Sequence, residues 1–256
     1  MHIARLATRN AFFAILPLLA VLAGCATGVG KLRAGQVLSD RVGFAGEVFP
    51  LPPGRWRVFY ANTKRNTVAG GFNGQTPTVV LVQERAGVAT GVGLFAADRL
   101  EGRAYFWTNP ACVRHDLLWR RLAHANHLNF GVSATFDCAI IVPTALPAAG
   151  SAPALPPLVA LAAAGAGRPG WIPPLWLEVG YFKSISSQEV LLASYRFDPR
   201  ALGDPADALG GFWARGRMSA TETAILDRLS RWALASWPAV HRGMAGAGGV
   251  GPLAAP

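Results

Sequence analysis

The residues best suited to chemistry in this sequence form a polar cluster between positions 114 and 127. His115 and Asp116 stand at its start, and His124 and His127 follow. Imidazole nitrogens and carboxylate oxygens are common zinc ligands, and two histidines three residues apart share one face of a helix. A histidine beside an aspartate can also activate a serine. The cluster therefore predicts one candidate metal site or hydrolase site.

The same residues are also typical of an ordinary protein surface. Asn126 is expected to end the helix between the two histidines, and none of the many serines is singled out. The sequence has no Gly-x-Ser-x-Gly, no His-Glu-x-x-His and no phosphate-binding Gly-x-x-x-x-Gly-Lys. We therefore assign no catalytic residue, no metal and no cofactor, and we favour packed or exposed histidines over a site.

The N-terminal stretch has the pattern of an export signal. Arg5 and Arg9 precede an apolar run over residues 11–22, and the sequence Leu-Ala-Gly-Cys closes it at Cys25. The run has the length of a signal sequence and is too short to span a bilayer comfortably. This stretch resembles the lipobox of bacterial lipoproteins. An ordinary cleaved signal peptide, with Cys25 incidental, is the alternative.

The lipoprotein resemblance implies a compartment and a membrane anchor. Cleavage would remove residues 1–24, and Cys25 would carry the lipid, including palmitate. Two or three acyl chains hold a protein stably because each buried methylene contributes about 0.8 kcal/mol. Ala26 and Thr27 follow Cys25 where an aspartate would favour the inner membrane. The resemblance therefore implies an outer-membrane lipoprotein that faces the periplasm.

The other two cysteines are expected to form a disulfide. Cys112 and Cys138 make an even pair once Cys25 is acylated, and exported proteins keep such pairs oxidised. Two buried free thiols are the alternative. A cysteine-based metal site is disfavoured, because neither residue has a second cysteine within four positions.

The charge is strongly basic. The formal net charge is +10, and it becomes about +8 when Arg5 and Arg9 leave with the signal. The balance indicates either a solvated, arginine-rich surface or attraction to an anionic surface such as phospholipid headgroups. The arginines are scattered along the chain without a basic stripe, which disfavours nucleic acid as a partner.

The pattern of apolar residues predicts mostly strands, with a helix at the end. Ser219 and Glu222 form a capping box before an apolar helical face that Pro238 stops or kinks. Helical spacing also predicts a helix over 116–125, and residues 158–164 are either a helix or an Ala/Pro linker. Strands are expected at 41–49, 55–60, 78–84, 88–96, 103–108, 127–136, 139–142, 175–182 and 189–197.

These elements predict an α+β fold. It is a mainly antiparallel β-sheet with a C-terminal amphipathic helix packed on it. The expected organisation is a signal peptide (1–24), a tether (25–40), a single β-rich domain (41–242) and a disordered tail (243–256). Three aromatic segments, at 51–56, 176–181 and 194–199, and a late helix that carries Trp232 and Trp237 are similar to those of a group of uncharacterised exported proteobacterial proteins. That resemblance implies one exported domain and no particular activity.

Eight tryptophans are many for this length. Trp107, Trp119, Trp171 and Trp176 either fill the core of a β-rich domain or line a face that binds sugar or lipid. The expected function is that of a membrane-anchored, non-enzymatic binding or structural protein of the cell envelope. Its partner would be an envelope component or another protein. The alternative is a periplasmic hydrolase or metal-binding protein that uses the histidine cluster.

Overall fold

The structure is a computed structural model of the chain. It describes residues 30–256 except 69–71, 102–109, 129–131, 148–155, 187, 205–212 and 215. The proposed signal peptide, Cys25 and the strand expected at 103–108 therefore lie outside the described residues.

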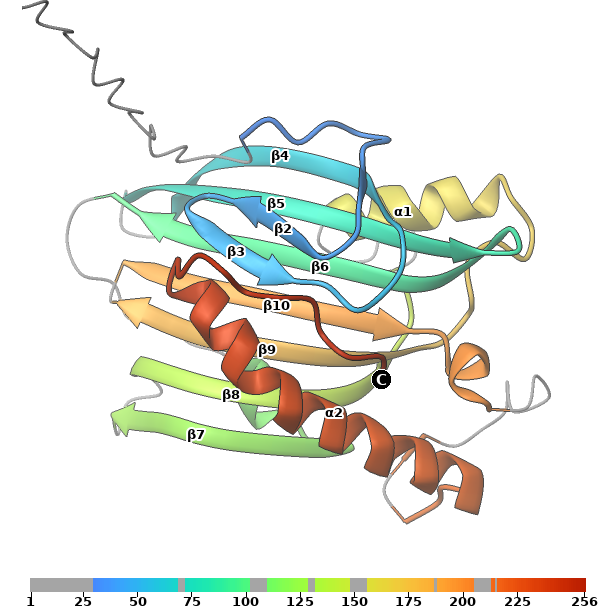
Figure 1. The fold of residues 1–256 in the computed structure, drawn as a ribbon. Helices are drawn as coiled ribbons and strands as arrows, with labels where there is room; N and C mark the ends of the chain where they lie inside the picture. Colours follow the sequence, from blue (N-terminus) through green and yellow to red (C-terminus); the bar gives the residue numbers. More distant parts are fainter. Residues whose placement is uncertain are drawn as a thin grey trace, which may run out of the picture.

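One large antiparallel sheet dominates the fold (Figure 1). Its eight strands run in the order β1-β4-β5-β6-β10-β9-β8-β7, and each neighbouring pair is antiparallel. From one edge to the other they are β1 (Val37–Leu38), β4 (Trp56–Val68), β5 (Phe72–Arg85), β6 (Val88–Leu100), β10 (Glu189–Phe197), β9 (Trp176–Ser186), β8 (Val132–Thr144) and β7 (Trp119–Leu128).

The remaining elements cover the two faces of this sheet. They are a small hairpin of β2 (Arg41–Phe44) and β3 (Glu47–Pro50), and two helices, α1 (Pro156–Ala166) and α2 (Ala220–Met244). Of two short 3-10 turns, η1 (Pro110–Val113) lies between β6 and β7, and η2 (Pro199–Leu202) lies between β10 and α2. In Figure 1, α2 crosses β8, β9 and β10 on one face, while α1 lies behind the sheet on the other. The predicted α+β class is confirmed.

The strands predicted at 78–84 and 88–96 are present as β5 and β6, and they form a hairpin. Arg85 pairs with Val88, so only two residues form the turn. Ala86 and Gly87 both have positive φ, of 49° and 77°. Two left-handed residues match the twist of adjacent strands, which explains why the chain reverses here.

The face beneath α2 and the β2–β3 hairpin is an aromatic core. The ring of Tyr195 stands edge-on to Phe95 at 5.4 Å and to Trp232 at 5.7 Å between centroids. Both buried tyrosine hydroxyls donate to backbone carbonyls: Tyr195 to Pro50 at 2.7 Å, and Tyr181 to Ala233 in α2 at 3.0 Å. These bonds satisfy the polar atoms and tie both covering elements to the sheet.

Helix α2 begins at the predicted capping box. The Ser219 hydroxyl accepts from the Glu222 backbone at 3.1 Å, and the Glu222 carboxylate accepts from the Ser219 backbone at 2.6 Å. Pro238 lies inside the helix and does not end it, so α2 runs for 25 residues to Met244. The buried side chains of its second half pack on the sheet and offset the cost of the proline.

The C-terminal segment differs from the expected disordered tail. Val250 and Leu253 are buried, and the Leu253 backbone N–H donates to the Leu51 carbonyl at 2.9 Å. The Trp232 indole donates to the Ala254 carbonyl at 2.8 Å. The segment thus completes the core beside α2, which its Gly/Ala-rich composition did not indicate.

The opposite face has two apolar clusters. Leu158 and Leu161 of α1 pack with Trp171 and Trp176 over β5 and β6, so residues 158–164 form a helix rather than a linker. A disulfide joins Cys112 to Cys138 inside the second cluster, where η1 covers β8 and β9. Within the described chain, no helix is long and apolar enough to cross a membrane.

Candidate functional site

The helix predicted over residues 116–125, which would have placed the histidines of the cluster on one face, is wrong. Residues 119–128 form β7, an edge strand paired with β8. In the backbone register, His124 lies opposite Asp137, and His127 lies opposite Ser133. The side chains of both histidines are outside the described atoms. The helical face on which the prediction depends is therefore absent.

The first half of the cluster is an exposed turn after η1. His115 and Asp116 are both exposed, and Asp116 accepts from the Arg114 guanidinium at 2.8 Å. This hydrogen bond lowers the pKa of Asp116. Among the described residues, no group of three or more His, Cys, Asp or Glu side chains is placed to hold a metal ion.

A buried polar group lies instead on neighbouring central strands. Arg196 of β10 pairs with Glu178 of β9 at 2.9 Å, and the Ser194 hydroxyl donates to the same carboxylate at 2.9 Å. The exposed fractions of the Arg196 and Glu178 side chains are 7% and 11%. Sequence reasoning missed this group. The signal was available, because polar residues alternate with core residues in both strands.

A second half-buried group fixes the end of α2 to the sheet. The His241 ring lies 4.3 Å from the Trp237 ring, and its Nε2 is 3.1 Å from Asp137 Oδ1. Lys183 Nζ lies 3.8 Å from the other Asp137 oxygen, and the Arg121 guanidinium lies 5.1 Å from the centre of the Trp237 ring. These contacts connect α2 to β7, β8 and β9, so their role is to hold the helix against the sheet.

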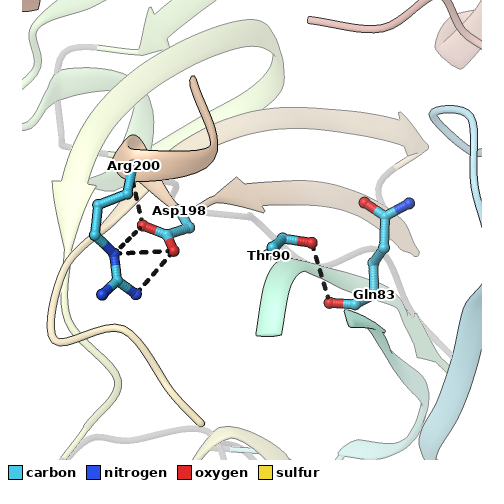
Figure 2. A network of polar contacts seen from close by, with 4 residues as sticks. All are labelled: Gln83, Thr90, Asp198 and Arg200. Carbon is cyan, nitrogen blue, oxygen red and sulfur yellow. Dashed lines mark hydrogen bonds and ion pairs between the residues drawn. The ribbon is translucent and has the colours of Figure 1, made fainter. Parts of the chain in front are cut away.

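A small cavity of about 170 Å³ lies beside the network in Figure 2. Asp198 accepts from the Arg200 backbone at 3.0 Å and from its guanidinium at 2.9 Å, and this bond raises the pKa of Arg200. The Thr90 hydroxyl donates to the Gln83 carbonyl at 3.5 Å, and the Gln83 amide donates to Pro53 at 2.9 Å. These hydrogen bonds hold η2 and the neighbouring ends of β5 and β6 in place.

A larger cavity, of about 270 Å³, opens at the same end of the sheet on the other face. Its lining contains Val37, Arg55, Arg57, Val82, Glu84 and Gly87. Arg55 and Arg57 are exposed and two positions apart, so they project from one face of the chain at the start of β4. Neither side chain makes a hydrogen bond or ion pair with any residue that the structure describes.

The acid in this lining is already engaged. Glu84 Oε1 accepts from the Trp171 indole at 2.9 Å and lies 3.5 Å from the Arg168 guanidinium. Arg168 in turn stacks on Trp171, with 4.2 Å between the guanidinium carbon and the ring centre. The cavity therefore presents two cations that have no partner among the described residues, beside one acid that is already paired, which favours an anionic ligand.

The edge of the sheet around this cavity is basic. The segment before β1, β1 itself and β4 with Arg55 before it (residues 30–38 and 55–68) contain six Lys or Arg and no Asp or Glu. Backbone bonds hold the first described residues against β4: Gly35 donates to Val58, and Val58 donates to Gln36, each at 2.8 Å. The fold thus places the cations of this N-terminal part of the chain along one edge of the sheet.

Comparison with known proteins adds no family. No family model matches the chain, and neither a curated protein nor a solved structure matches it. The function is therefore inferred from the chain's own residues.

Proposed function

We propose that the protein is a lipoprotein of the bacterial cell envelope, anchored at the outer membrane and facing the periplasm. Its folded domain acts as a non-enzymatic binding or structural module. The observation that carries this proposal is the sequence Leu-Ala-Gly-Cys at the end of the apolar run, with Arg5 and Arg9 before it. Cys25 is the residue that receives the lipid.

The disulfide supports export. Cys112 of η1 and Cys138 of β8 are joined and buried, with exposed fractions of 3% and 0%. Structural disulfides persist in oxidising compartments and are rare in the cytoplasm. A pair of this kind therefore fits a periplasmic domain.

The start of the fold also fits an N-terminal anchor. The described chain begins at Gly30 and joins the sheet at Val37, twelve residues after Cys25. An extended chain covers at most about 3.6 Å per residue, so this edge of the sheet lies within about 45 Å of the lipid. The domain is thus held near the membrane by its β1 edge, from which it reaches a partner or an envelope component.

Metabolic labelling with palmitate tests the anchor. We expect the full chain to incorporate label and to partition into the detergent phase, and Cys25→Ser to do neither. The control is the double variant Cys112→Ser/Cys138→Ser, which should keep its label because those thiols lie in the folded domain. Label that persists in Cys25→Ser would reject the proposal.

A further inference from the structure

The cavity beside β1 has the composition of a phosphate site. Two guanidinium groups, from Arg55 and Arg57, line it without a partner among the described residues. Guanidinium groups bind phosphate oxygens in pairs of parallel hydrogen bonds. Val37 and Val82 add apolar surface to the lining, which suits a ligand with both a charged and an apolar part.

The position of the cavity identifies the source of that phosphate. Val37 belongs to the lining and is also the residue at which the chain from Cys25 joins the sheet. We propose that this cavity binds the phosphate of an anionic phospholipid headgroup in the membrane that anchors the protein. This inference rests on the proposed lipid anchor, which brings the β1 edge to the bilayer.

The charge around the cavity supports a surface contact rather than an isolated site. Four further exposed cations belong to the same edge of the sheet: Lys31 and Arg33 before β1, and Lys64 and Arg65 farther along β4. Each cation close to an anionic membrane surface raises the constant for binding to that membrane by roughly fivefold. Lys64 and Arg65 also protect an exposed strand edge from pairing with another chain, which is compatible with membrane contact.

Chemical modification of arginine tests this on the full chain. The protein is reconstituted in lipid discs of phosphatidylcholine, alone or mixed with phosphatidylglycerol, and phenylglyoxal rates are read by mass spectrometry. We expect Arg55 and Arg57 to react about fivefold more slowly on the anionic discs. The protection should vanish in about 1 M salt, where the screening length is about 3 Å.

The chain contains its own matched control. Arg231 and Arg242 are exposed on α2, which covers the opposite face of the sheet, so their rates should be equal on both kinds of disc. Equal rates at Arg55 and Arg57 on both discs would overturn the inference. Inorganic phosphate is the second probe, added to the chain in neutral detergent. If phosphate alone gives the protection seen on anionic discs, the site binds free anions and the headgroup assignment is wrong.

Variants extend the test to the whole edge. Arg55→Gln/Arg57→Gln should raise hydrogen exchange in β1 and β4 on anionic discs to the neutral-disc rate. Arg231→Gln/Arg242→Gln removes the same charge and should leave exchange slow. Palmitate labelling separates the two proposals. Protected arginines on a chain without label would reject the anchor and keep the headgroup site, whereas labelled chains with unprotected arginines would do the reverse.

Discussion

Glu178 and Arg196 form a buried ion pair across the two central strands β9 and β10, with 2.9 Å between Oε2 and Nη2. They are direct partners in the strand register. The Ser194 hydroxyl donates to the other oxygen of Glu178, so each carboxylate oxygen has a partner. The pair lies on the sheet face that α1 and η1 cover, where an unmatched charge would be costly.

Removing one member of this pair should destabilise the fold strongly. Glu178→Gln leaves the Arg196 charge buried without its counter-charge, and we expect a loss of about 3–5 kcal/mol in the free energy of unfolding. Replacing both residues, as Glu178→Leu/Arg196→Leu, should cost less than the single change. Urea denaturation followed by circular dichroism measures both.

The exposed pair of Arg114 and Asp116 is the control for this prediction. Their side chains are 42% and 54% exposed, so Asp116→Asn should cost less than about 1 kcal/mol. A Glu178→Gln variant as stable as Asp116→Asn would show that the buried pair contributes nothing.

The elements with strong local signals were predictable from the sequence. Residues 219–222 fix the start of α2 through side-chain bonds to their own backbone, and the β5–β6 hairpin follows from apolar strands around a two-residue turn. Both depend on residues close together in the chain. The antiparallel sheet with a helix on it therefore agrees with the sequence prediction.

Strand β7 shows where local pattern fails. Leu117, Leu118 and Leu122 have helical spacing, yet the last of these lies in a strand with bulges on either side of His124 and Ala125. The apolar strand β8 needs a second neighbour for its backbone groups, and β7 supplies it. This tertiary demand overrides the local preference, so the helical face on which the histidine prediction depended does not form.

The basic cavity could not be read from the sequence either. In the sequence, nothing distinguishes Arg55 and Arg57 from other exposed arginines. They line a cavity only because the fold places β1 and the β5–β6 turn beside them. Glu84, the acid in the same lining, accepts a hydrogen bond from Trp171, a residue 87 positions away in the sequence. The net charge of the chain predicts the sign of the partner's charge. The place of the binding cavity depends on contacts between residues that are far apart in the sequence.

The disulfide should be a major source of stability. It closes a loop with a sequence separation of 26, which corresponds to about 3 kcal/mol on the chain-entropy estimate. Cys112→Ser/Cys138→Ser should lose about that amount in urea denaturation, and reductant should shift the wild-type protein equally. Cys25→Ser should leave domain stability unchanged. Two alkylatable thiols in freshly exported, unreduced protein would contradict the pairing.

Glu47 should make stability fall as pH rises. Burial raises the pKa of the Glu47 carboxyl group from 4.5 to about 7, because the cost of burying its charge outweighs the attraction of Arg99. The negative charge of Glu189 raises this pKa further. Between these two pH values, the folded state holds a proton that the unfolded state has lost, so the folded state loses stability as pH increases through about 7. The midpoint of urea denaturation, measured from pH 4.5 to pH 8, should decline over this range.

Glu47→Gln isolates this contribution. The variant stays neutral at every pH, so its decline should be shallower than that of the wild type. Burial also raises the pKa values of Asp98 and Asp204, whose effects remain in both proteins and cancel in the difference. Parallel profiles for the variant and the wild type would contradict the assignment to Glu47.

Gly243, near the end of α2, should not tolerate even a methyl group. Alanine normally stabilises a helix by about 1 kcal/mol over glycine. Here a Cβ would overlap the backbone carbonyl oxygen of Val48 in β3, an atom that cannot step aside as a flexible side chain can. Gly243→Ala should therefore lose about 1–3 kcal/mol, the usual cost of overpacking. Gly248→Ala is the control, because a Cβ there meets no atom within 4 Å. A gain in stability for Gly243→Ala in urea denaturation would mean that α2 and β3 do not pack as closely as described.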